Sequence, residues 1–172
     1  MRNLYCLIIC LWLSGCGFHA RGPMTLAPPL QNLYLQTADP YGQLAKNIRV
    51  YLKMSGIHLA QTPAAATSVL EILSENTSEQ LLNISGTQTT RQYNLILTVA
   101  YRITDNKGNI LTDTQIATET RSLTIDANQM LSSSNQAVSL YQQMRIAIVY
   151  DIMSRLASRD ITAVLTKSKS AT

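Results

Sequence analysis

The stretch YNLILTVAYRITDNKG, residues 93–108, gives the clearest structural pattern in this chain of 172 residues. From Tyr93 to Thr104, apolar residues alternate with mostly polar ones, as in a strand with one buried face. Residues 105–108 have the composition of a tight turn. A threonine-rich stretch from Asn109 to about Ile125 follows, so the pattern predicts a long antiparallel hairpin.

Helices are expected on both sides of this hairpin. Upstream, Asp39–Pro40 has the composition of an N-cap followed by proline at the first helical position, and Gly56 suits the C-terminal end. Downstream, an apolar ridge at i, i+4 spacing starts near Ser134 and predicts a long amphipathic helix, which residues 161–165 could continue. The ridge consists of Ala137, Leu140, Met144, Ile148, Ile152 and Leu156.

Shorter strands are predicted over residues 33–36, 57–59 and 69–74, the second of which could instead lead into a loop. We expect residues 75–90 to form a hairpin-like connection around Gly86, with residues 81–84 extending the sheet. The fold class predicted is α/β in a two-layer, α+β-like form: a small mixed sheet of about four strands with two helices packed on it. The first strand–helix–strand unit should be parallel with a right-handed crossover.

The N-terminal segment has the features of a lipoprotein signal. Arg2 supplies a positive charge, and the apolar run from Leu4 to Leu13 is too short for a bilayer span, which needs about 20 residues. The sequence Leu13–Ser14–Gly15–Cys16 fits the bacterial lipobox, in which the Cys16 thiol is acylated and cleavage follows Gly15. Gly17 stands where an aspartate would retain the protein in the inner membrane, which favours a lipid anchor on the periplasmic side of the outer membrane.

These features divide the chain into four parts. They are a signal peptide (residues 1–15), a lipidated N-terminus and tether (16–31), a single α/β domain (32–166) and a flexible tail (167–172). Cys6 and Cys10 leave with the signal, so the mature chain keeps no thiol for a disulfide, a metal or a nucleophile once Cys16 carries lipid.

The composition argues against nucleic acid as a partner. Removing residues 1–15 deletes one arginine and no acid, so the formal charge falls from +4 to +3, and no basic run or basic–aromatic interleaving is present. Charged residues make up only 14% of the chain, against about 25% in an average soluble domain. A polar but weakly charged surface suggests that a partner covers much of it.

No motif in the sequence predicts catalysis. The Ser-nucleophile, P-loop, dinucleotide-binding and zinc-protease patterns are all missing. His19 and His58 stand alone, the carboxylates are scattered, and we therefore predict no enzyme activity, no metal and no cofactor.

Several segments, in order along the chain, resemble the LptE family of lipopolysaccharide (LPS)-assembly lipoproteins. Residues 16–22, CGFHARG, are similar to the Cys-Gly-aromatic-His-x-Arg start that is typical of its mature members. The other segments are the helix entry Asp39–Gly42 with its exit Ser55–Ile57, the strand start Gln92–Leu95, and Arg121–Ser122 with Asn128–Met130 before the last helix.

The resemblance implies a non-enzymatic protein that works with the outer-membrane β-barrel LptD. Family members plug the lumen of this barrel, support its assembly and bind LPS. Phosphate groups of LPS require cations, and the loops that carry them in some members read Asn83–Gly86 and Ser132–Ser134 here. Arg91 and Lys107 are then the nearest candidates for LPS contact.

Two other readings stay open. The chain could be an accessory lipoprotein of an envelope lipid transporter, or, less favoured because its usual motif is missing, a peptidoglycan-tethering lipoprotein. On the barrel reading, we expect the tips around Gly86 and Lys107 to enter the lumen first, and photo-crosslinkers at Thr87, Lys107 and Ser133 to capture the barrel. The hydroxyl face expected to meet a partner or solvent comprises Thr112, Thr114, Thr118 and Thr120.

Overall fold

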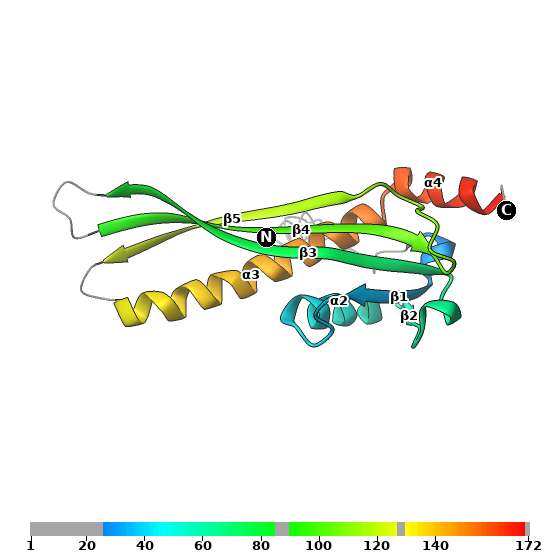
Figure 1. Cartoon of the computed structure of the whole chain (residues 1–172), viewed down its shortest axis with the longest axis horizontal. Helices are drawn as coiled ribbons and strands as arrows, with labels where there is room; N and C mark the ends of the chain where they lie inside the picture. The colour runs from blue at the N-terminus through cyan, green and yellow to red at the C-terminus, as the bar shows by residue number, and fades with distance from the viewer. Residues whose placement is uncertain (1–25, 85–89, 127–129, 171–172) are drawn as a thin grey trace, which may run out of the picture.

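The computed structural model of the chain describes residues 26–84, 90–126 and 130–170. Figure 1 shows a long, narrow molecule in which a twisted sheet runs alongside a long helix. The strands are β1 (Asn32–Thr37), β2 (His58–Leu59), β3 (Ser68–Ile84), β4 (Thr90–Asp105) and β5 (Gln115–Asp126). The helices are the short 3-10 turns η1 (Pro28–Leu30) and η2 (Pro63–Ala65) and the α-helices α2 (Gln43–Met54), α3 (Met130–Leu156) and α4 (Arg159–Ser170).

The sheet confirms the predicted mixed α+β class. Its strand order is β2-β1-β3-β4-β5, with β1 parallel to both β2 and β3 and with β3, β4 and β5 antiparallel. Five strands and three α-helices form among the described residues, where about four strands and two helices were expected. The parallel strand–helix–strand unit β1–α2–β2 is confirmed.

Strand β3 is much longer than predicted. The polar residues after Ser74 stay paired with β4, through two register shifts, as far as Ile84 opposite Arg91. The polar composition after Ser74 was misleading because this part of β3 is an edge strand. Strand β1 ends opposite Ile72 and leaves the rest of β3 paired on one side only. An edge strand tolerates charged and polar side chains and need not alternate with apolar ones. The hairpin turn expected around Gly86 lies outside the described residues.

Helix α2 begins later than predicted. Gly42 occupies the N-cap and Gln43 the first helical position, whereas Asp39 accepts a hydrogen bond from the Tyr41 amide at 3.2 Å and so closes a turn before the helix. The end of the helix is as predicted. Gly56 has a φ of 75° and its amide donates to the Lys53 carbonyl, the arrangement in which glycine ends a helix.

The C-terminal region differs from the prediction at both ends. Helix α3 starts at Met130, so the expected loop at residues 132–134 is helical. The last segment forms a separate helix, α4. The Ser158 hydroxyl accepts a hydrogen bond from the Ile161 amide and so caps the N-terminus of this helix. This helix reaches Ser170 and includes residues 167–170 of the segment expected to be a loose tail.

The returning strand also starts later than predicted. Residues 109–114 form a loop, which a single bridge from Ile110 to Thr104 joins to β4. Here the Thr112 hydroxyl accepts a hydrogen bond from the Ile103 amide at 3.0 Å, so a side chain takes the place of the backbone carbonyl of a neighbouring strand. Thr112 is buried and does not belong to the exposed hydroxyl face expected from the sequence.

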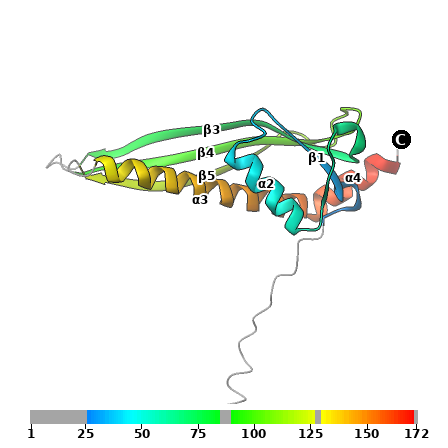
Figure 2. The ribbon, with the colours of Figure 1, turned by 90° about the horizontal axis from the view of Figure 1, so that it is seen from below.

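One apolar core lies between the sheet and helices α2 and α3. The alternating residues of β4 predicted to be buried, from Leu95 to Ile103, and the ridge residues Met144, Ile148 and Ile152 of α3 are almost completely buried. Figure 2 shows α3 along one face of β3, β4 and β5. The periodicities of the strand and of the helix therefore predicted the two halves of the core.

Tyr101 joins the sheet to α3 at the edge of the core. Its hydroxyl donates to Gln115 at 2.8 Å. Burial, with a smaller contribution from Asp151, outweighs the effect of Arg155 and raises the pKa of Tyr101 to about 12. Since an unfolded tyrosine ionises near pH 10, the neutral form of Tyr101 is favoured in the folded protein.

This pKa shift predicts a loss of stability in alkali. The contribution of Tyr101 is complete below pH 10 and should be lost as the pH rises from 10 to 12, because only the unfolded chain ionises easily in that range. Denaturant titrations at a series of pH values would show a smaller fall for Tyr101→Phe than for the wild type. An equal fall in stability of the wild type and of Tyr101→Phe would contradict this assignment. Tyr150→Phe, which changes an exposed tyrosine, is the control.

Candidate interaction surface

The face of the sheet opposite α3 carries mostly polar side chains. In β4, odd-numbered residues such as Leu97 and Val99 point into the core, so even-numbered residues point away from α3. Paired residues of β3 and β5 share that side. We call this surface the bare face; it comprises Ser74, Asn76, Ser78, Gln80, Asn94, Ile96, Thr98, Ala100, Ile116, Thr118, Thr120, Ser122 and Thr124.

The bare face is polar and has no charged side chain. Every one of its residues is exposed or half-buried. Among the described residues, no helix lies over it at the end of the sheet where α3 starts (Figure 2). Hydroxyl and amide groups pair across its strands, as between Thr98 and Thr118 at 3.4 Å and between Ser122 and Asn94 at 3.1 Å. Such groups can donate and accept hydrogen bonds without bringing a charge into an interface.

After Ser74, the charged side chains of β3 and those of β5 that the structure describes lie on the other face, beside α3. Glu75 pairs with Arg145 of α3 at 2.6 Å, and Glu119 pairs with Arg121 at 2.7 Å. On the outward side, the pair Glu71–Arg102 lies beyond Ser74, at one end of the bare face. The separation of charged from uncharged side chains between the two faces is therefore nearly complete.

The hydroxyl face predicted for β5 is partly confirmed. Thr118 and Thr120 lie on the bare face with Ser122 and Thr124, while Thr114 is exposed in the loop before the strand. The sequence missed the β3 half of this face because residues 75–80 were expected to form a connection. The signal was present as an alternation of charge: Ser74, Asn76, Ser78 and Gln80 are uncharged, whereas Glu75 and Glu79 between them are acidic.

Arg91 and Lys107 lie at opposite ends of the molecule. Arg91 is at the start of β4, and Lys107 follows its end, in a turn where the Lys107 amide donates to Asp105 at 2.8 Å. At about 3.3 Å per residue the two positions are roughly 50 Å apart along the strand. They cannot contact one lipid head group together, because the two ends of β4 lie at opposite ends of the molecule (Figure 1).

The Lys107 end is also where the described chain begins. Ser68, which lies opposite Asp105, donates its hydroxyl to the Pro29 carbonyl at 3.0 Å. We call this the proximal end and the end with Ile84 and Arg91 the distal end. Cys16, His19 and Thr87 lie outside the described residues, and the proximal end is thus the one nearest in sequence to the expected lipid anchor.

An apolar cleft of about 420 Å³ lies at the distal end between the sheet and the first turns of α3. Leu123, Ile125, Ala137 and Val138 supply its apolar wall, and Glu79 and Tyr141 its polar rim. Burial raises the pKa of Tyr141, and Glu79 raises it further. Arg91 is paired with Ile125, so an exposed cation stands next to an apolar depression.

The histidine and the carboxylates that the structure describes do not gather into a metal site. His58 is exposed on β2, and within residues 26–84, 90–126 and 130–170 no three histidine, cysteine or acidic side chains come together as a metal site would require. Over the same residues, no helix combines the length and the apolar character of a bilayer span.

Comparison with protein families gives one clear match. The profile of the family described as LptE, lipopolysaccharide-assembly, matches residues 30–156. Similar curated proteins are named LPS-assembly lipoprotein LptE. That of Yersinia enterocolitica is 32% identical over 91 residues, which are 52% of this chain and 44% of the relative. That of Photorhabdus laumondii is 25% identical over 97 residues, 56% of this chain and 53% of the relative. The matches thus span about half the length of these relatives.

Solved structures share the fold. A minor lipoprotein of Acinetobacter baumannii superimposes with a TM-score of 0.64 at 26% identity, over 74% of this chain and 91% of the other. The rare lipoprotein B of Shewanella oneidensis gives a TM-score of 0.66 at 21% identity, over 76% and 97% of the two chains. The arrangement of strands and helices described above is therefore shared with bacterial lipoproteins.

Proposed function

The chain belongs to the LptE family of LPS-assembly proteins, and on this basis we propose that it is an outer-membrane lipoprotein that works with the β-barrel LptD to place LPS in the outer leaflet. In this role it fills the barrel lumen and supports barrel assembly. No step of this role needs catalysis. Its partners are the barrel, LPS and the membrane that holds its lipid anchor.

The bare face carries this proposal. The lumen of an outer-membrane barrel is lined by polar residues, and a plug that presents unpaired charges to such a wall loses their hydration without compensation. The hydroxyls and amides of Asn76, Thr98 and Thr118 can bond to polar wall residues directly or through water. A polar sheet face without a charged side chain is expected where a polar partner covers it.

The position of the anchor gives the plug a direction. Leu26 is the tenth residue after Cys16, a reach of at most about 35 Å for a fully extended chain. A lipid on Cys16 therefore keeps the proximal end near the periplasmic leaflet, while the distal end can enter the lumen. This replaces the expectation that the tip at Lys107 enters with the tip near Gly86.

We place LPS contact at the distal end, on Arg91. The guanidinium can bind a phosphate of the lipid head group through two parallel hydrogen bonds. The apolar cleft beside Ile125 offers a surface on which an acyl chain can lie. Lys107, at the far end of β4, cannot take part in the same contact.

Photo-crosslinking in cells tests the plug proposal. A photo-reactive residue at Ile96 or at Thr118, both on the bare face, should capture the barrel protein. The same residue at Lys107 is the matched control, because the proximal end stays outside the lumen and should give little or no barrel product. Crosslinks from Ile96 and Thr118 only to soluble periplasmic proteins or to an inner-membrane transporter would favour the role of a transporter accessory.

Lipidation at Cys16 has its own test. Cys16→Ala should abolish labelling by a palmitate analogue and leave the precursor uncleaved, because several acyl chains on this residue make membrane anchoring effectively permanent. Equal label on the wild type and the variant would contradict the lipobox assignment. Cys10→Ala, in the expected signal, is the control and should label normally.

A further inference from the structure

Strand β1 has an open edge beside α2. Strand β2 pairs only with Asn32 and Leu33, and its chain departs after the Ala60 amide donates to the Leu33 carbonyl at 3.0 Å. Backbone groups two residues apart point to the same side of a strand. The amide and carbonyl of Leu35 and of Thr37 therefore face this edge, and within the described parts of the chain no strand pairs with them there.

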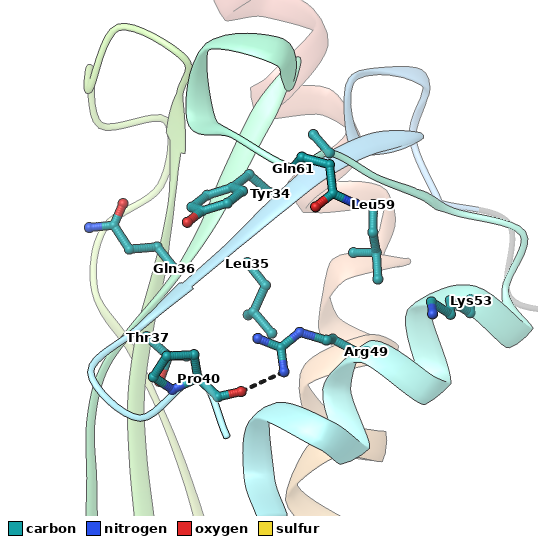
Figure 3. A pocket seen from close by; sticks show the side chains of 10 residues that line it. Tyr34, Leu35, Gln36, Thr37, Pro40, Arg49, Lys53, Leu59 and Gln61 are labelled. Atoms are coloured by element: carbon teal, nitrogen blue, oxygen red, sulfur yellow. Dashed lines mark hydrogen bonds between the residues drawn. The ribbon is translucent and has the colours of Figure 1, made fainter. Parts of the chain in front are cut away.

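A cleft of about 390 Å³ lies along the open edge, between β1, the chain after β2 and helix α2 (Figure 3). Leu59, Ala60 and Gln61 line one side, and Arg49 and Lys53 of α2 line another. Figure 3 shows the Arg49 guanidinium at the Pro40 carbonyl, to which it donates at 2.6 Å. The cleft thus combines unpaired strand groups with two cationic side chains.

The two cationic side chains of this cleft have no acidic partner in its lining. None of the residues that line it is acidic, and the ion pairs found among the described residues involve other arginines. The segment before Leu26 cannot supply the missing charge, because residues 1–25 contain no aspartate or glutamate. An acidic group from another molecule fits this site by charge.

We propose that the open edge of β1 binds an extended polypeptide segment of a partner protein that carries an acidic side chain. The segment adds a strand to the sheet by bonding to the backbone of Leu35 and Thr37, the mode of β-strand addition. Its carboxylate pairs with Lys53 and with the guanidinium edge of Arg49 that the Pro40 carbonyl leaves free. This inference concerns the proximal half of the molecule and does not depend on the barrel partnership of the bare face.

Selection from displayed random heptapeptides on the detergent-solubilised full-length lipoprotein tests the proposal. Selected peptides should share an aspartate or glutamate at one position, and binding of such a peptide should slow hydrogen exchange at the Leu35 and Thr37 amides at least tenfold. Lys53→Gln should weaken this peptide about tenfold, the effect of one charge-assisted hydrogen bond. Lys46→Gln removes a second exposed lysine of α2, one that does not line the cleft, and should bind the peptide as the wild type does.

Several results would overturn the inference. A selection without an acidic consensus, a peptide bound equally by wild type and Lys53→Gln, or a bound peptide that leaves exchange at Leu35 unchanged would each do so. If no peptide is selected and sodium phosphate alone slows hydrogen exchange in the cleft, the cleft is a small-anion site instead. Thermal melts of both lysine variants distinguish lost binding from lost folding.

Discussion

Replacing Leu97 by alanine should lower the free energy of unfolding by about 2–5 kcal/mol, the range for deleting a large buried side chain. Leu97 is 0% exposed at the centre of β4. Ile148, 1% exposed, belongs to the same core from the side of α3. Ile148→Ala should cost a similar amount, because neither side of a well-packed core can collapse fully into the space that is left.

The control for this prediction is Ile116→Ala. Ile116 is a large apolar residue of the same sheet but is 59% exposed on the bare face, so its truncation should change the stability by no more than about 0.5 kcal/mol. Denaturant titration gives all three values. A midpoint unchanged by Leu97→Ala would mean that the core lies on the other side of the sheet.

The second large effect is expected from charge on the bare face. The double variant Asn76→Asp/Gln80→Glu keeps the size of both side chains and adds two negative charges to the outward side of β3. An unpaired charge enclosed at an interface costs several kcal/mol, so recovery of the barrel with this variant should fall at least tenfold. Since both positions are exposed, the fold itself should be unaffected.

A matched variant separates contact from net charge. Gln142→Glu/Gln143→Glu makes the same chemical change at two exposed positions of α3, on the side of the molecule where charged side chains already occur. Barrel recovery should stay near the wild-type level. Equal loss with both double variants would show that total charge matters and that the bare face does not.

The hairpin and the long helix were predictable because packing sets their pattern. Leu95 to Ile103 and the ridge from Met144 to Leu156 face the same core, so each shows the period of its own backbone. The outer half of β3 carried no such pattern, since one of its faces is bare and one of its edges is free. There, Glu75 and Glu79 gave the segment the composition of a loop although its backbone pairs with β4 as far as Ile84.

The candidate site was harder to predict for a geometric reason. Arg91 and Lys107 are both near turns in the sequence, but Arg91 is at the start of a strand of 16 residues and Lys107 follows its end, which places them at opposite ends. Likewise, Arg49 and Lys53 gave no signal, because their cleft exists only where β2 stops and leaves β1 open. Single residues could be chosen from the sequence, whereas their grouping needed the strand register.

Affinity purification of the wild-type lipoprotein from outer membranes solubilised in mild detergent tests the central claim most directly. The account predicts that one very large β-barrel protein is recovered with it in a one-to-one ratio, and that crosslinks within this complex map to the bare face. Recovery of the lipoprotein alone, or with an inner-membrane transporter and no barrel, would contradict the account.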